Sequence, residues 1–143
     1  MHNTLKGEFI PSNPQKYVGT YPIIYRSSWE LTVCKMCDGH QNIIQWASEP
    51  VKIPYRNPLT GKHTVYVPDF LVIFEDRTGK QRGELWEIKP RKQTFVEEAI
   101  RTKDKLALAV NAAKWAAAQA WAKRHDLSFR VITETDIYRN TKK

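Results

Sequence analysis

The sequence has few of the features that define membrane, secreted and disulfide-rich proteins. No apolar run approaches the roughly 20 residues that a membrane-spanning helix needs. Residues 1–16 contain no apolar segment of the kind found in secretory signals. Cys34 and Cys37 are the two cysteines, and their spacing indicates no disulfide framework. We therefore expect an intracellular protein that is neither secreted nor bound to a membrane.

Acidic residues are scarce relative to basic ones. The chain has 15 Asp and Glu against 23 Lys and Arg, which gives a formal net charge of +8. This excess favours a polyanionic partner such as nucleic acid, although a basic solvated surface is the alternative. The 143 residues include 41% hydrophobic residues and five tryptophans, so we expect one globular domain spanning residues 1–143.

The first part of the chain predicts an extended arm followed by a helix. Residues 1–25 carry three prolines and little periodicity, so we expect them to cross the surface as an arm. Ser27 is expected to cap the helix, with Glu30 as its partner in a capping box. The helix should end near Asp38 and Gly39, with Gly39 in the left-handed conformation.

The remainder of the chain predicts strands and a second, long helix. Pro68 should mark an edge, a bulge or a bend within one long strand pattern. The long helix should end near His125 and bury a stripe formed by Trp115, Ala118 and Ala122. Strands are expected over residues 43–46, 51–55, 63–74, 83–89 and 129–132, and a second capping box over 94–97. These elements predict an α/β domain with a mixed central β-sheet flanked by α-helices.

Two short motifs carry the chemistry. Asp69 follows Pro68 in one strand pattern, and Glu87 and Lys89 lie two residues apart in another. Because side chains alternate along a strand, Glu87 and Lys89 share a face, while Trp86 and Ile88 suit the opposite, buried face. Paired carboxylates suit Mg²⁺, which polarises a phosphate and lowers the pKa of a bound water. A lysine beside them can orient the water or stabilise developing charge.

The ordered motifs resemble the PD-(D/E)XK nuclease superfamily. Members share a restriction-endonuclease-like core, a mixed four-stranded sheet with a helix on each side. The resemblance implies that Asp69, Glu87 and the carbonyl of Ile88 bind the metal, and that Lys89 is the catalytic lysine. Glu30 matches the acidic residue of the upstream helix and is a further candidate ligand. The implied cofactor is Mg²⁺, with Mn²⁺ able to substitute, and no small-molecule cofactor is expected.

A closer resemblance covers most of the chain. It is to the head-completion nucleases of T4-like tailed phages and, more loosely, to the N-terminal catalytic domain of TnsA-type endonucleases. This resemblance implies a DNA nuclease that processes packaged phage DNA during head completion and head–tail joining, with head or neck proteins as further partners. It would act in the host cytoplasm during phage assembly or on the virion. The segments that carry the resemblance are residues 16–19, 25–30, 67–70 and 114–118.

Basic residues near the catalytic strand are the candidates for DNA contact. Arg91 and Lys92 follow that strand directly, and Lys114 lies on the long helix. Their alternative role is a solvated surface. No recognition helix or zinc finger is evident, so we expect cutting with little sequence specificity.

Each site residue also has a structural interpretation. Glu30 could only complete the capping box, Asp69 could serve the turn after Pro68, and Glu87 with Lys89 could be a simple ion pair. Glu84, three residues before Glu87, should face away from it. Cys34 and Cys37 fit buried packing better than a zinc site, because no second ligand pair follows. The main rival function is a non-catalytic DNA-binding or virion assembly protein with a nuclease-like fold; another is an RNA nuclease.

Overall fold

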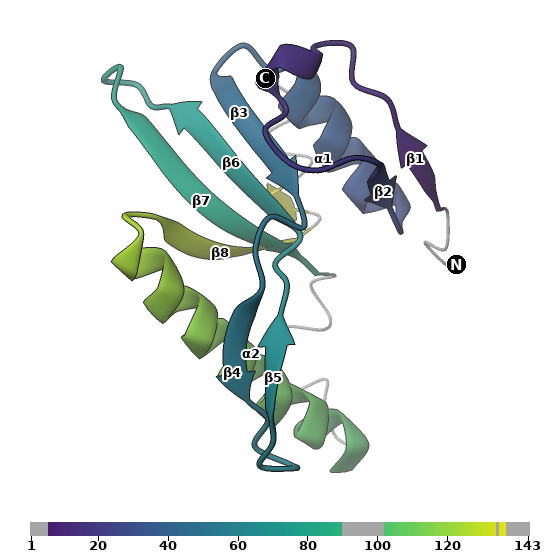
Figure 1. Cartoon of the computed structure of the whole chain (residues 1–143), viewed down its shortest axis with the longest axis vertical. Helices are drawn as coiled ribbons and strands as arrows, with labels where there is room; N and C mark the ends of the chain where they lie inside the picture. The colour runs from purple at the N-terminus through teal and green to yellow at the C-terminus, as the bar shows by residue number, and fades with distance from the viewer. Residues whose placement is uncertain (1–5, 90–101, 134, 137–143) are drawn as a thin grey trace.

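The computed structural model describes residues 6–89, 102–133 and 135–136. Most of these residues fall into short strands and two longer helices, arranged as in Figure 1. No helix in the described part of the chain is long and apolar enough to cross a membrane. The elements are β1 (Gly7–Phe9), η1 (Pro14–Lys16), β2 (Ile23–Tyr25), α1 (Ser28–Gly39), β3 (Ile43–Ser48), β4 (Ile53–Arg56), β5 (His63–Tyr66), β6 (Phe70–Glu75), β7 (Gln81–Ile88), α2 (Thr102–Arg124) and β8 (Ser128–Ile132).

The central sheet has four strands in the order β3-β6-β7-β8. The first three strands run antiparallel, and β8 pairs with β7 in parallel. A parallel pair needs a long crossover connection, and α2 lies on the path between β7 and β8. The chain is therefore an α/β protein with a mixed central sheet between helices, and the predicted restriction-endonuclease-like core is confirmed.

One hydrophobic core lies between the sheet and α1. Strand alternation sends Trp86 toward this core, while its neighbour Leu85 enters the core on the other face. Trp46 on β3 is fully buried here, with Phe9 and Tyr17 against its ring. The predicted packing role of Cys34 and Cys37 is confirmed, because both are buried in α1 as free cysteines.

A second core lies between the other face of the sheet and α2. Ala118 and Ala122 are fully buried, and Trp115 packs against the same cluster, so the predicted apolar stripe is confirmed. The β4–β5 hairpin packs on α2 as well, through Ile53 and the ring of Tyr66. Small alanines let α2 approach the sheet closely along this stripe.

The N-terminal segment is more structured than the predicted arm. Within residues 6–25, β1 pairs antiparallel with β2, and η1 lies between them in sequence. Tyr17 and Ile23 are buried in the α1 core. Asp38 fixes this segment, since its carboxylate accepts from the amides of Ser12 (3.0 Å) and Asn13 (2.8 Å). Proline-rich sequence hid these strands because their pairing depends on partners brought together by the fold.

The start of α1 agrees with the sequence in part. Ser27 is the N-cap, and its Oγ accepts from the Glu30 amide at 3.1 Å, as predicted. The Glu30 carboxylate, however, accepts from the amide of Arg26 at 3.2 Å and does not complete the box on Ser27. The helix ends at Gly39 as expected, but Gly39 is not left-handed; the amide of His40 donates to the Met36 carbonyl instead.

The long strand predicted over residues 63–74 is two strands in two sheets. β5 pairs with β4 and β6 joins the central sheet, with Pro68 at the bend between them. The bend predicted at Pro68 is therefore confirmed, and the single strand is wrong. A proline lacks the N–H that would continue the ladder, so the chain leaves one sheet before entering the next. The capping box predicted over 94–97 lies outside the described residues.

Candidate active site

Asp69 stands at the bend between β5 and β6, directly before β6 begins. Its backbone is held on both sides: its amide donates to the Trp86 carbonyl and its carbonyl accepts from the Glu49 amide, both at 2.9 Å. Glu49 adopts a left-handed conformation (φ 48°) at this point. The Asp69 carboxylate accepts from the amide of Ile88 at 2.7 Å. Asp69 is thus fixed against the end of β7, the strand that carries the second motif.

Glu87 reaches the same place from β7. It lies two residues after the buried Leu85 and therefore on the α2 side of the sheet, opposite Trp86, as predicted. The hydroxyl of Tyr66 donates to Glu87 Oε1 at 2.5 Å. The other oxygen, Oε2, lies 3.9 Å from Lys89 Nζ. The two carboxylate oxygens therefore meet different partners.

Lys89 follows the last residue of β7. Its amide donates to the Ile132 carbonyl at 2.9 Å, which extends the parallel β7–β8 ladder by one residue. Its side chain is 22% exposed and that of Glu87 is 15% exposed. The ammonium group is thus next to the carboxylates while still open to solvent. The structure brings Glu87 and Lys89 together as the sequence predicted.

Glu30 approaches this group from the first turn of α1. Its charge acts on Asp69, and the charge of Glu87 acts on it, so the three carboxyls form one electrostatic cluster. Arg26 lies one residue before the N-cap and binds Glu49 at 2.6 Å. Arg26 was not among the site residues predicted from the sequence, yet its charge interacts with both Glu30 and Asp69.

Burial and repulsion between like charges raise the pKa values of the three acids. Burial raises the pKa of Asp69 to about 8, with the Glu87 charge as the next cause, and the Ile88 amide and Lys89 oppose the shift. Burial raises the pKa of Glu87 as well, against the lowering effects of Tyr66, Lys89 and Lys114. The pKa of Glu30 is also raised, again mainly by burial. Without a bound cation, burial and mutual repulsion therefore make all three carboxyls harder to ionise than exposed acids.

This donor set fits a divalent metal ion bound through oxygen. Carboxylates that repel one another in a partly buried place are relieved by a cation between them. Among the described residues no group of three or more His, Cys, Asp and Glu side chains is placed so that it could hold a metal ion by itself. Mg²⁺ does not require such a group, since it commonly takes one or two carboxylates and keeps several waters. Asp69 and Glu87 supply those carboxylates.

Two side chains of the site were missed or assigned another role by the sequence. From the sequence Tyr66 was placed only within a predicted strand, yet its hydroxyl donates a hydrogen bond to Glu87. Burial raises the pKa of this hydroxyl, so it stays protonated and remains a donor. Lys114 was expected to contact DNA. Its Nζ lies 6.0 Å from the centre of the Tyr66 ring, and its charge acts on Glu87. Helical or strand position alone could not reveal either, because their meeting depends on how the hairpin packs on α2.

Arg91 and Lys92 are outside the described residues. Glu84 faces away from Glu87 as predicted: its Oε1 accepts from Trp86 Nε1 at 2.7 Å and pairs with Arg130 at 3.3 Å on the α1 side.

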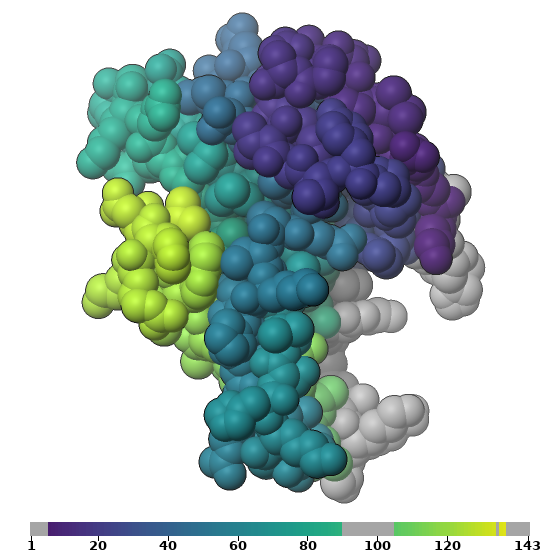
Figure 2. Space-filling view, viewed as in Figure 1, coloured from purple at the N-terminus to yellow at the C-terminus, as the bar shows by residue number. Residues whose placement is uncertain are grey.

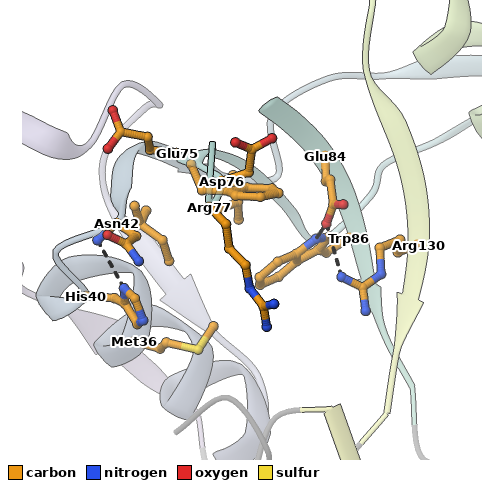
Figure 3. Close-up of a pocket in the computed structure, with 12 residues that line it drawn as sticks. Met36, His40, Asn42, Glu75, Asp76, Arg77, Glu84, Trp86 and Arg130 are labelled. Atoms are coloured by element: carbon orange, nitrogen blue, oxygen red, sulfur yellow. Dashed lines mark hydrogen bonds and ion pairs between the residues drawn. The ribbon is translucent and has the colours of Figure 1, made fainter. Parts of the chain in front are cut away.

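A cavity of about 370 Å³ lies on the α1 side of the sheet, on the face opposite to that of Glu87. Figure 3 shows Arg77 and Arg130 beside the Trp86 ring at its rim. None of the predicted catalytic residues lines it, so the acidic cluster and not this cavity is the candidate active site.

The comparisons with known proteins agree with this geometry. A family model described as "TnsA-like endonuclease N terminal" matches residues 40–134, a range that contains Asp69, Glu87 and Lys89. The chain belongs to the TnsA-like endonuclease family. It is also 34% identical over 142 residues to the "Head completion nuclease" of Enterobacteria phage T4, with 92% of each chain covered. The predicted resemblance to both groups of nucleases is therefore confirmed, and the chain is a nuclease by descent.

Proposed function

We propose that this TnsA-like protein is a Mg²⁺-dependent DNA nuclease that cuts phosphodiester bonds with little sequence specificity, and that Mn²⁺ can substitute. One observation carries the proposal. Asp69, at the bend before β6, and Glu87, on β7, are held in place by hydrogen bonds and interact through their charges, and the Lys89 ammonium group lies 3.9 Å from Glu87. A structural ion pair would not need a second buried carboxylate beside it.

The metal would be held by Asp69, Glu87 and the main-chain carbonyl of Ile88, with Glu30 as an auxiliary acid. The Ile88 amide points at Asp69, and a strand residue directs its amide and carbonyl to the same side, so the carbonyl faces that side too. A bound Mg²⁺ supplies charge that polarises the phosphate and acidifies a water. Lys89 then orients the attacking water or stabilises the charge that develops on phosphorus oxygens.

The biological role that we propose is the processing of packaged phage DNA during head completion and head–tail joining. It rests on the name of the T4 relative and on coverage of nearly the whole of both chains. Head or neck proteins would be partners in this role. The protein would act in the host cytoplasm during assembly, or on the virion.

We expect weak sequence specificity because a basic chain binds DNA mainly through phosphates and not through base edges. The net charge of +8 favours contact with phosphates, which is independent of base sequence. Arg91, Lys92 and Lys114 remain our candidates for such contacts. Lys114 has the best support, because it lies beside Tyr66 and acts on Glu87.

The test is plasmid cleavage in Mg²⁺, in Mn²⁺ and in EDTA. We expect cleavage with either metal and none with EDTA. Asp69→Ala, Glu87→Ala and Lys89→Ala should each reduce the rate by at least about 100-fold, because each removes a group that acts on the reacting phosphate.

A matched pair separates chemistry from folding. Glu87→Gln and Glu84→Gln make the same change on one strand, but only Glu87 faces the cluster. We expect loss of cleavage in the first and near-normal cleavage in the second. Full activity of Asp69→Ala would refute the site, and binding without cleavage under every metal condition would favour the non-catalytic rival. An RNA substrate cut faster than DNA would change the substrate class.

A further inference from the structure

The β4–β5 hairpin presents a basic outer face next to the acidic cluster. From residue 50 to residue 68 the chain contains lysine, arginine and histidine but no aspartate or glutamate. In Figure 1 the hairpin lies in front of α2 and extends away from the central sheet. Figure 2 shows it as the lower end of this face of the molecule. The hairpin therefore carries positive charge that no acidic residue within it neutralises.

The pairing of the two strands decides which side chains face outward. Ile53 is paired with Tyr66, and both are buried on the α2 side. Pro54 is paired with Val65, and Arg56 with His63, and all four are exposed. Paired residues share a face and successive residues alternate, so Arg56 projects from the face opposite α2.

Two lysines flank the paired strands. Lys52 precedes β4 and continues its alternation onto the outer face, whereas Lys62 lies in the loop at the tip, directly before β5; both are exposed. Arg56 Nε donates to the Gly61 carbonyl at 3.1 Å, which fixes the base of the guanidinium group. Within the part of the chain that the structure describes, none of these three cations forms an ion pair. Their charge is therefore available to an external anion.

The hairpin is connected directly to the site. Tyr66, the last residue of β5, donates to Glu87, and Lys52 lies beside this end because Ile53 pairs with Tyr66. Arg56 and Lys62 lie toward the tip. From Lys52 to Arg56 the strand extends about 13 Å, close to the length of four base-pair steps in B-DNA. The cations thus run from the end of the hairpin that Tyr66 joins to Glu87 out toward the tip, over a length of several phosphates.

We infer that this hairpin binds the phosphate backbone of the duplex through Lys52 and Arg56 on its outer face and Lys62 at its tip, and directs the duplex to the acidic cluster. The inference rests on the proposed function and adds a surface to it. Because α2 covers the inner face, the hairpin lies along the backbone and does not insert into a groove as a free ribbon. Contacts of this kind read no bases, in keeping with weak specificity.

The test compares three triple variants in a DNA-binding assay. Lys52→Gln/Arg56→Gln/Lys62→Gln neutralises the hairpin. Lys52→Arg/Arg56→Lys/Lys62→Arg keeps its charge. The matched surface control neutralises three exposed cations elsewhere: Lys35→Gln/Arg77→Gln/Lys80→Gln. Binding of each to a fluorescein-labelled duplex is followed by anisotropy in EDTA, which prevents hydrolysis, over a range of salt concentrations.

We expect the neutral hairpin variant to bind at least about tenfold more weakly and to lose about 0.9 from the salt slope for each phosphate contact, or roughly 3 in total. The charge-preserving variant and the surface control should keep the parent slope. In Mg²⁺ the neutral hairpin variant should show a raised KM with kcat unchanged at saturating DNA, because none of the three substituted side chains is among the proposed catalytic groups.

The outcomes separate the two proposals. A parent that cuts DNA, with equal binding by the hairpin variant and the surface control, would overturn the hairpin inference alone and leave the nuclease intact. A parent that neither binds nor cuts DNA would overturn both. Thermal melts of the three variants should coincide with the parent, since the substituted side chains are exposed.

Discussion

Tyr66 determines how the Glu87 carboxylate is oriented. Its hydroxyl occupies Oε1 at 2.5 Å and thereby leaves Oε2 as the oxygen that faces Lys89. The ring is buried against Phe129 and α2, so the hydroxyl is held from behind by packing. A carboxylate fixed in this way loses little freedom when it binds a cation, which is the advantage of a preorganised ligand.

Tyr66→Phe should weaken metal binding without unfolding the protein. The change removes one hydrogen bond and keeps the ring, so we expect a stability cost of about 1 kcal/mol. Loss of a partner behind a ligand commonly costs about 10-fold or more in metal affinity. Calorimetric titration with Mn²⁺ measures it directly.

Tyr55→Phe is the matched control, because Tyr55 lies in the same hairpin and has no hydrogen bond to the acids. Unchanged Mn²⁺ affinity in Tyr66→Phe would show that the bond to Glu87 has only a structural role.

At the scale of elements, α2 holds the hairpin against the site. Its buried stripe contacts β4, β7 and β8, so one helix fixes both the catalytic strand and the hairpin that carries Tyr66. The contact depends on small side chains, and Ala118 and Ala122 are both fully buried. A larger residue in the stripe has no space unless the helix moves away from the sheet.

Ala122→Leu should therefore destabilise the fold by about 1–3 kcal/mol through overpacking. Ala120→Leu places the same side chain on an exposed position of the same helix and should be neutral within about 0.5 kcal/mol. Chemical denaturation with a circular dichroism readout gives both values. Equal stability of the two variants would mean that the stripe is not tightly packed.

At the scale of the whole molecule, the acidic cluster makes stability depend on pH. The pKa of Asp69 is about 8 in the folded chain, because of burial and the Glu87 charge. An unfolded aspartate has a pKa near 3.9. Between about pH 4 and pH 8 the folded state therefore holds more protons, and the free energy of unfolding falls as the pH rises through this window.

We expect the metal-free protein to lose on the order of 1–3 kcal/mol of stability from pH 5 to pH 8. Melting temperatures in EDTA across this range provide the measurement, and Mn²⁺ added at pH 8 should restore stability by binding the ionised acids. Asp69→Asn cannot titrate, so its curve should be flatter than the parent's. An Asp69→Asn variant with the same pH dependence as the parent would contradict the expected role of this carboxyl.

The sequence by itself determined those features that depend only on neighbouring residues in the chain. Ser27 caps α1 because a hydroxyl before a helix satisfies a free amide, and Pro68 bends the chain because it has no amide to donate. Strand alternation placed Glu87 opposite Trp86 without any knowledge of the fold. The pattern of Pro68-Asp69 and Glu87-Ile88-Lys89 likewise indicated a nuclease, because it depends only on order and spacing.

Tertiary structure alone decided which distant residues meet. Tyr66, Arg26 and Lys114 reach the acids because a hairpin, a loop before a helix and a long helix pack together there. The pairing of β1 with β2 and the split of residues 63–74 between two sheets likewise depend on which segments the fold brings together. Burial, which raises the pKa values of the acids, arises only when these surfaces close over them, and no local pattern encodes it.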